Sequence, residues 1–457
     1  MNRVARRAKF ALVLAAVLLG GLVLFCADFL IHGSQWVVFS GSPHVYRGGN
    51  LDCGVVTDRE GRVLLDMTNG RTYADDADLR RATIHILGDR YGNISAPALA
   101  EYSSQMVGYD LVNGIYTVNG KSGQASLTIC AEAQLAALEG LNGRKGVVAV
   151  YNYKTGEILC MVSSPNYDPD NEPDIGEDTS GAYEGVYLNR FTQSAYVPGS
   201  IFKLVTTAAA LEAIDDIEER TFYCEGTYDI GADTVVCEGY HGQVDLGQAL
   251  TKSCNCAFAQ LALELGPERL GAYARQFGIT EPLEFDGITT ASGSFDVSSA
   301  ADVNVAWAAI GQYTDTVNPA RFMTFMGQIA GGGKAAVPYL VDRVSSGPFS
   351  SYSARTKMTD AVMERETARR LAELMRDNVI YGYGDWNFPD ISVCAKSGTA
   401  EVGGGREPNA TFAGFAQDPD YPLAFVVVVE NGGAGGATCA PIISDVLEAC
   451  MDCMDRE

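Results

Sequence analysis

A serine and a lysine lie three positions apart in the stretch YVPGSIFKLVTTAAALEAI, residues 196–214. The Pro-Gly pair predicts a turn, and residues 201–214, which contain no Gly or Pro, predict a helix. Side chains at positions i and i+3 share a helix face, so Ser200 and Lys203 can meet. A neutral lysine can take the proton of a serine that attacks a carbonyl carbon. The alternative is a serine that only caps the helix, followed by an ordinary helical lysine.

Two further polar motifs follow in the chain. Ser253-Cys254-Asn255 lies in TKSCNCAF, and Lys396-Ser397-Gly398-Thr399 follows the strand-like run ISVCA. Taken singly, the first could satisfy backbone groups and the second could be a surface turn. An earlier Lys-Ser-Gly at residues 121–123 lacks the Thr and precedes Ser200, so we interpret it as unrelated. Three motifs in this order indicate one site for acyl transfer through a serine.

The composition and the N-terminal sequence limit the class of protein. The chain has 457 residues, enough for two domains, and a net charge of −24, which argues against nucleic-acid binding as its main role. Residues 1–9 carry four basic side chains, and residues 10–31 are apolar apart from Asp28. This length can span a bilayer, and the basic flank predicts a cytoplasmic tail with the rest of the chain outside. A cleaved signal peptide is the alternative, but no small-x-small cleavage site follows the apolar run.

Cysteine and histidine usage gives weaker signals. The chain has 12 cysteines and four histidines, which are His32, His44, His85 and His241. Cys224 and Cys237 flank a hairpin-like segment and could form a disulfide outside the cytoplasm. The pair Cys450 and Cys453 has no second such pair and no histidine cluster beside it. The sequence therefore predicts neither a metal cluster nor a Ser-His-Asp triad.

The order of predicted elements suggests two extracytoplasmic parts. Residues 32–145 form a small module of mixed character. Two apolar runs at 147–151 and 158–162 flank a Lys-Thr-Gly turn and predict a β-hairpin. A mostly helical block follows to about residue 330, and strands then return before a final helix at roughly 440–453. We expect the early and late strands to share one antiparallel sheet flanked by helices, with a helical subdomain, in an α+β domain at residues 146–457.

These motifs resemble the class B penicillin-binding proteins, which are membrane-anchored peptidoglycan D,D-transpeptidases with a serine β-lactamase-like domain. VPGSIFKL is similar to the family's active-site helix, and HGQVDLGQALTKSCNCAFAQLALELG to its second-motif region. TGEILCMVSSPNYDP and DREGRVLL resemble the starts of its transpeptidase domain and N-terminal pedestal-like module. The chain departs from the family pattern at VNPARF and at Thr411-Phe412, where many members have Thr-Pro-Leu-Gln and an aromatic pair.

The resemblance implies a role for each motif residue. Ser200 would be the acylated nucleophile and Lys203 its base, since burial near Lys396 and the positive end of a helix lower a lysine pKa. Ser253 would relay a proton to the leaving amine, and Asn255 would hold the substrate amide and orient Lys203. Lys396 would attract the terminal carboxylate of D-Ala-D-Ala, with hydroxyl hydrogen bonds from Ser397 or Thr399. The N–H groups of Ser200 and Thr399 would form the oxyanion hole, and Gly398 would leave room for a peptide at the strand edge.

The resemblance also implies the partners. The donor would be a D-Ala-D-Ala stem peptide, the acceptor an amine on a neighbouring stem peptide, and β-lactams would trap Ser200. This chemistry requires no metal or organic cofactor. We find no glycosyltransferase-like motif before residue 146, so strand polymerisation would need a partner, by resemblance a polytopic membrane glycan polymerase.

Two other functions fit parts of the sequence. A D,D-carboxypeptidase or β-lactamase-like hydrolase would use the same motifs. A class A β-lactamase needs a deacylating Glu, but EPLEFD has Phe285 where an Asn is expected. A non-catalytic β-lactam-binding scaffold or sensor would keep the fold alone. The complete set of reactive side chains and the short segment before the apolar run disfavour this function.

Overall fold

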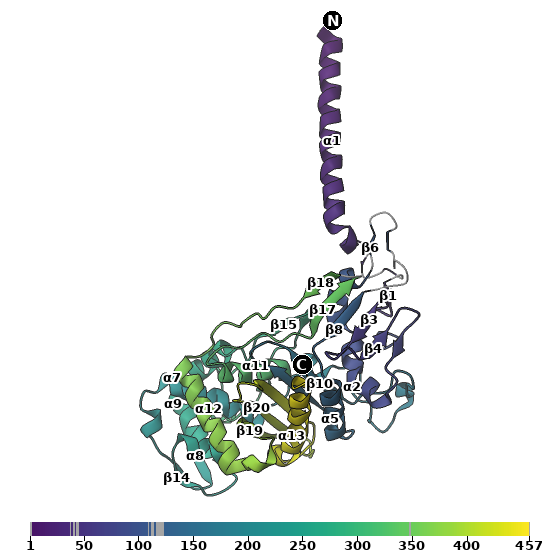
Figure 1. Ribbon diagram of the computed structural model, residues 1–457. Coiled ribbons are helices and arrows are strands. Elements are labelled where there is room, and N and C mark those ends of the chain that lie inside the picture. Colours follow the sequence, from purple (N-terminus) through teal and green to yellow (C-terminus); the bar gives the residue numbers. More distant parts are fainter. Residues whose placement is uncertain are drawn as a thin grey trace.

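The computed structural model describes residues 2–36, 38–39, 42, 45–107, 109–110, 114–115, 123–346 and 349–456. Residues 121 and 122 of the earlier Lys-Ser-Gly lie outside these ranges. One long N-terminal helix stands away from a globular body, which holds two large sheets, several two-stranded sheets and the remaining helices (Figure 1).

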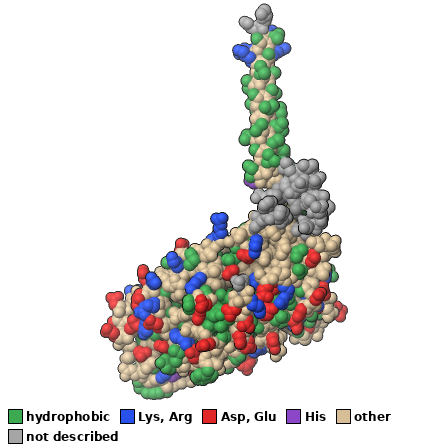
Figure 2. All heavy atoms as spheres, viewed as in Figure 1, with side chains coloured by type: hydrophobic (Ala, Val, Ile, Leu, Met, Phe, Trp, Pro, Cys, Tyr) green, Lys and Arg blue, Asp and Glu red, His purple; other side chains and the backbone are tan. Residues whose placement is uncertain are grey.

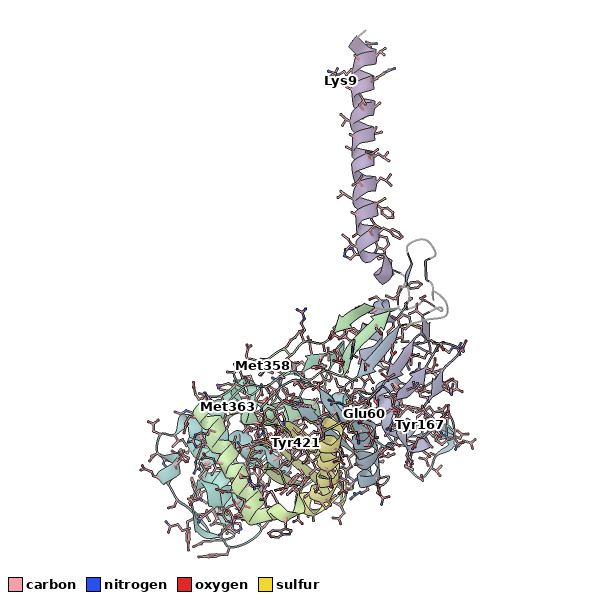
Figure 3. All side chains as sticks on the ribbon, viewed as in Figure 1. Lys9, Glu60, Tyr167, Met358, Met363 and Tyr421 are labelled. Atoms are coloured by element: carbon pink, nitrogen blue, oxygen red, sulfur yellow. The ribbon has the colours of Figure 1, made fainter. Side chains whose placement is uncertain are left out.

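The N-terminal helix α1 spans Asn2–Trp36 and contains the predicted apolar span. Within it, Arg3–Gly33 is long and apolar enough to cross a membrane. Figure 2 shows hydrophobic side chains along this helix and Lys and Arg side chains toward its far end. Figure 3 places Lys9 near that end, away from the globular body. The basic flank and the apolar stretch are thus both parts of one exposed helix.

A five-stranded antiparallel sheet forms the centre of the globular body, as the sequence predicted. Its strand order is β10 (Ile158–Ser164), β9 (Gly146–Asn152), β21 (Leu423–Val429), β20 (Asn409–Ala416) and β19 (Val393–Ala400). These strands are apolar on both faces because helices cover both sides. Helices α5 (Ala131–Leu141) and α13 (Gly435–Met454) pack on one face, and α11 (Pro319–Ala330) packs on the other. Strand β19, which carries the third motif, lies at the edge of the sheet.

A helical subdomain carries the first and second motifs. Its helices are α7 (Lys203–Ala213), α8 (Leu246–Thr251), α9 (Asn255–Gln276), α10 (Asp302–Ala309) and α12 (Arg365–Asp377). Small hairpins interrupt it, among them the predicted one, β12 (Thr227–Ile230) with β13 (Asp233–Val236). Strands β11 (Phe222–Cys224) and β14 (Gly242–Val244) pair on either side of that hairpin.

A second sheet of six strands lies between α1 and the central sheet (Figure 1). Four of its strands come from the N-terminal module: β3 (Val55–Thr57), β4 (Val63–Asp66), β5 (Thr72–Tyr73) and β8 (Gln124–Leu127). The other two, β17 (Val341–Ser346) and β18 (Phe349–Ser353), come from much later in the chain. Strand β17 pairs with β8 and thereby satisfies backbone groups that an open edge would expose. This sheet therefore contains strands from both sides of the predicted domain boundary at residue 145.

Candidate active site

Ser200 lies in a 3₁₀ turn, Gly199–Phe202, that leads directly into α7. Gly199 has a φ of +61°, a left-handed conformation that favours glycine. A Cβ at this position would lie 2.7 Å from the carbonyl oxygen of Thr399. Glycine therefore allows the turn to lie against strand β19, and this contact brings the first motif to the third.

Lys203 is fully buried and connects the first motif to the second. Its Nζ lies 3.1 Å from Ser200 Oγ. From the second motif, the Ser253 carbonyl oxygen lies 2.6 Å away, Ser253 Oγ 3.0 Å away and Asn255 Oδ1 2.8 Å away. The carbonyl and amide oxygens can only accept hydrogen bonds. If Nζ is neutral, its two hydrogens can go to these acceptors, and its lone pair is then left for the Ser200 hydroxyl.

The environment of Lys203 favours this neutral form. Burial and the nearby charge of Lys396 lower its pKa to about 7, and Cys237 and Cys254 partly oppose the shift. Burial also lowers the pKa of Lys396 to about 8, partly opposed by Glu238. A lysine base near neutral pH is what activation of a serine requires.

Ser253 Oγ joins the two lysines. It lies 3.0 Å from Lys203 Nζ and 3.2 Å from Lys396 Nζ. Lys396 Nζ also donates to the Ser397 carbonyl oxygen at 2.9 Å. Ser253 has a φ of +52°, which is uncommon outside glycine and indicates a conformation held by its surroundings. A proton can pass along this hydroxyl between the two amines.

The third motif faces two environments along β19. Lys396 and Gly398 are buried, whereas Ser397 and Thr399 are half-buried. A Cβ on Gly398 would overlap the Thr411 hydroxyl and the Pro198 carbonyl. We predicted that a glycine at position 398 leaves room for a substrate peptide. In the structure, it instead allows the close approach of the turn that carries Ser200. The edge position of β19 leaves backbone groups that an extended peptide can pair with.

Two contacts at the site were not predicted from the sequence. The Tyr383 hydroxyl accepts from the Ser397 backbone N–H at 2.8 Å and lies 3.0 Å from Ser397 Oγ, so it fixes this serine. The Asn255 side-chain amide donates to the Val236 carbonyl oxygen at 2.9 Å. One donor of Asn255 is thus used within the protein. Only the Gly/Tyr-rich run YGYGDW before the third motif hinted at a specialised turn.

The cysteine and histidine predictions need correction. Cys224 and Cys237 are both free thiols, so the suggested disulfide is not formed. The scattered histidines predicted no metal cluster. In the structure, however, His241 lies with Cys224, Cys237 and Cys254, and their ligand atoms are all within 4.8 Å of one another. Pairing of β11 with β14 produces this group, and sequence spacing alone did not predict that pairing.

Comparison with known proteins identifies the family. The model of the penicillin binding protein transpeptidase domain matches residues 146–448. The chain belongs to the class B penicillin-binding proteins. It is similar to peptidoglycan D,D-transpeptidase PbpA of Mycobacterium tuberculosis, with 31% identity over 337 residues that cover 67% of each chain. It is also similar to stage V sporulation protein D of Bacillus subtilis, with 28% identity over 82% of this chain and 58% of that one.

Solved structures show the same fold for this penicillin-binding protein. The D,D-transpeptidase domain of a peptidoglycan glycosyltransferase from Eggerthella lenta aligns with a TM-score of 0.75 and 26% identity, covering 89% of this chain and 99% of that one. A penicillin G acyl-enzyme complex of penicillin-binding protein A from M. tuberculosis aligns with a TM-score of 0.75 and 25% identity, covering 88% and 99%.

Proposed function

We propose that this penicillin-binding protein is a peptidoglycan D,D-transpeptidase in which Ser200 is acylated by D-Ala-D-Ala stem peptides and by β-lactams. One observation carries the assignment of roles. Lys203 Nζ lies within hydrogen-bond reach of Ser200 Oγ while two acceptors from the second motif hold it. The names of the similar transpeptidases and the acyl-enzyme structure of a similar protein support the same activity.

The first half-reaction forms the acyl-enzyme. Ser200 Oγ attacks the carbonyl of the penultimate D-Ala while its proton moves to Lys203 Nζ. The C–N bond to the terminal D-Ala then breaks, and the leaving amine takes a proton through Ser253 Oγ, which contacts both lysines. Lys396 attracts the terminal carboxylate, and the N–H groups of Ser200 and Thr399 bind the developing oxyanion.

The second half-reaction transfers the acyl group. An amine of a neighbouring stem peptide attacks the ester carbonyl, Lys203 or Ser253 takes its proton, and Ser200 leaves as the hydroxyl. The donor peptide adds to β19 as an extra strand, with its side chains over half-buried Ser397 and Thr399.

The apolar helix α1 anchors the protein in this proposal, with its basic end in the cytoplasm and the catalytic domain outside. A polytopic membrane glycan polymerase would supply the glycan strands and contact α1 and the six-stranded sheet. Figure 1 shows this sheet between α1 and the transpeptidase domain, where such a partner could reach both.

Product analysis tests the activity. The full chain in detergent is incubated with a synthetic stem pentapeptide and an amine acceptor, and the products are separated by mass spectrometry. A transpeptidase gives the cross-linked product and free D-Ala. Release of D-Ala with only a shortened tetrapeptide would instead establish a D,D-carboxypeptidase. A Ser200→Ala variant should give neither product.

A further inference from the structure

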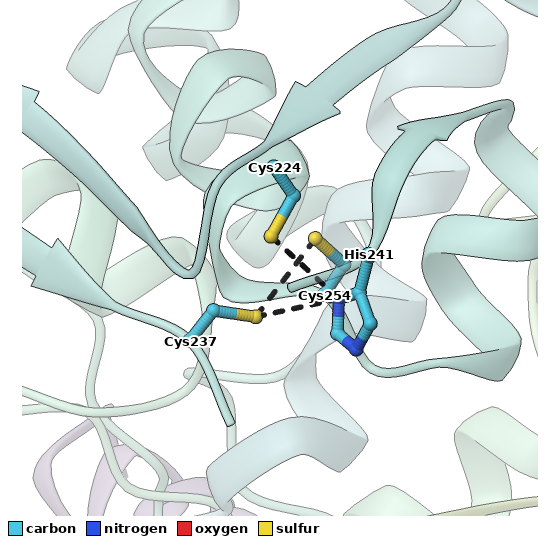
Figure 4. Close-up of side chains that lie close together, drawn as sticks. All are labelled: Cys224, Cys237, His241 and Cys254. Atoms are coloured by element: carbon cyan, nitrogen blue, oxygen red, sulfur yellow. Dashed lines mark hydrogen bonds between the residues drawn. The ribbon is translucent and has the colours of Figure 1, made fainter. Parts of the chain in front are cut away.

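Four side chains with metal-binding atoms meet beside the second motif (Figure 4). Cys224 ends β11, Cys237 follows β13, His241 precedes β14, and Cys254 is the N-cap of α9. Three segments of the chain thus bring their sulfur and nitrogen atoms to one point. Cys224 and Cys254 are fully buried, and Cys237 is 8% exposed.

The distances among these atoms fit one metal ion. His241 Nδ1 lies 3.7 Å from Cys224 Sγ and 3.5 Å from Cys237 Sγ, and Cys237 Sγ lies 3.9 Å from Cys254 Sγ. With Zn–S bonds of about 2.3 Å and Zn–N bonds of about 2.0 Å, a tetrahedral ion separates its ligands by about 3.8 Å for two sulfurs and about 3.5 Å for sulfur and nitrogen. These three separations therefore match those in a tetrahedral shell, and all four ligand atoms lie within 4.8 Å of one another.

A disulfide explains the group less well. Bonded sulfur atoms lie about 2.05 Å apart, whereas Cys237 and Cys254 are 3.9 Å apart, and a disulfide would leave out one cysteine and the histidine.

We propose that Cys224, Cys237, His241 and Cys254 bind one structural Zn²⁺ ion. Three thiolates and one imidazole fill a closed tetrahedral shell, which is typical of structural rather than catalytic zinc. Binding releases the thiol protons to solvent and involves no change of oxidation state. Soft sulfur ligands in this geometry select zinc over Mg²⁺ or Ca²⁺.

The ion would position the catalytic residues of the second motif. Cys254 lies between Ser253 and Asn255, and Ser253 holds its left-handed conformation next to it. Val236, the neighbour of Cys237, accepts the hydrogen bond from Asn255. Zinc would thus fix the start of α9, where Ser253 and Asn255 hold Lys203, and the hairpin end that holds Asn255. This effect on acylation depends on the proposed function, whereas the metal content does not.

Metal analysis of the full chain tests the site. The protein is purified in detergent without chelators, and its zinc is measured by inductively coupled plasma mass spectrometry. We expect about one zinc per wild-type chain. The His241→Ala and Cys224→Ser variants should bind zinc at least about 100-fold more weakly than the wild type. Cys439→Ala is the matched control, since Cys439 is equally buried but lies on α13 outside the group, and it should keep the zinc.

Cobalt gives a readout that needs no variant. Zinc is removed with a chelator and replaced by Co²⁺, and we expect the charge-transfer absorption of thiolate-bound tetrahedral Co²⁺. Protein that contains no zinc and takes up neither Zn²⁺ nor Co²⁺ would overturn the proposal, as would a Cys237–Cys254 disulfide found in non-reducing peptide maps.

Labelling by a fluorescent penicillin separates this proposal from the proposed function. If zinc is bound and its removal slows acylation about tenfold or more, both hold. If zinc is bound but the zinc-loaded chain is never acylated, the metal site stands and the assigned activity fails. If the wild-type chain binds no zinc and is still acylated normally, the metal proposal fails alone.

Discussion

At the scale of single residues, Lys203 is the residue on which the proposed chemistry depends. Its Nζ lies 3.1 Å from Ser200 Oγ, and burial holds its pKa at about 7. Lys396 is equally buried but contacts Ser253 rather than Ser200. The two lysines therefore have different expected roles, base and carboxylate binder.

Replacement of Lys203 by Met removes the base while keeping a long apolar side chain in the buried site. We expect acylation by a β-lactam to slow by about 10²–10⁴-fold, the usual contribution of a positioned base. Stopped-flow or gel-based labelling measures the rate, and circular dichroism checks the fold. Acylation at the wild-type rate by a folded Lys203→Met protein would rule out this role.

The two lysines also predict how acylation depends on pH. Lys203 must be neutral, so the rate should rise as pH increases through about 7. Lys396 must be charged, so the rate should fall as pH increases through about 8. Because the groups interact, the two limbs report apparent values for the pair. A rate constant that is flat between pH 6 and about 9 would contradict the assignment.

The residues of the three motifs could be predicted because each motif is local and their order is specific. Ser200, Lys203, Ser253, Asn255 and Lys396 do come together in the structure. Tyr383 was missed because its contact with Ser397 depends on a short π-helix, Asn378–Tyr383, which has no clear sequence pattern. His241 was missed because only the pairing of β11 with β14 brings it to the cysteines.

At the scale of elements, the contact between the Ser200 turn and strand β19 positions the site. Two glycines permit it, Gly199 on the turn and Gly398 on the strand. The hairpin, the edge strand and the helices of this domain follow from apolar runs and turn residues, so the sequence predicted them. The sequence did not predict that β17 and β18 join the sheet of the N-terminal module. Strands that pair across a large sequence distance leave no local pattern.

A Gly199→Ala substitution tests the contact between these elements. The added methyl group would lie 2.7 Å from the Thr399 carbonyl oxygen, so the turn and the strand must separate. We expect acylation to slow by about 100-fold, since displacement by about 1 Å can have this effect.

Gly181→Ala is the matched control for this substitution. Gly181 also has a positive φ, +75°, but a Cβ there meets no atom within 4 Å. The control shares the backbone strain without the contact, so it should acylate normally. Equal rates for the two variants would show that the contact is not required.

At the scale of the whole molecule, one buried carboxyl group makes stability depend on pH. Asp315 is fully buried, and among the described residues neither of its oxygens has a hydrogen-bond partner. Burial raises its pKa from 3.8 to about 9. The folded chain therefore holds a proton that the unfolded chain loses, so the free energy of unfolding falls as pH rises between these values.

We expect Asp315→Asn to stabilise the protein at pH 8 by about 1–3 kcal/mol and to flatten this pH dependence, because Asn carries no charge to bury. Thermal unfolding at several pH values measures the effect. Asp390→Asn serves as the control, since Asp390 is exposed and its replacement should change little. A less stable Asp315→Asn protein at pH 8 would contradict the prediction.

The complete molecule combines an apolar helix, a second sheet and a catalytic domain. Its proposed activity depends on one atom, Ser200 Oγ. The most direct measurement labels the full chain in detergent with a fluorescent penicillin and maps the modified peptide by mass spectrometry. The proposed mechanism predicts a long-lived ester on Ser200 and no label in Ser200→Ala. A label on another residue, or an equally labelled and folded Ser200→Ala protein, would contradict it.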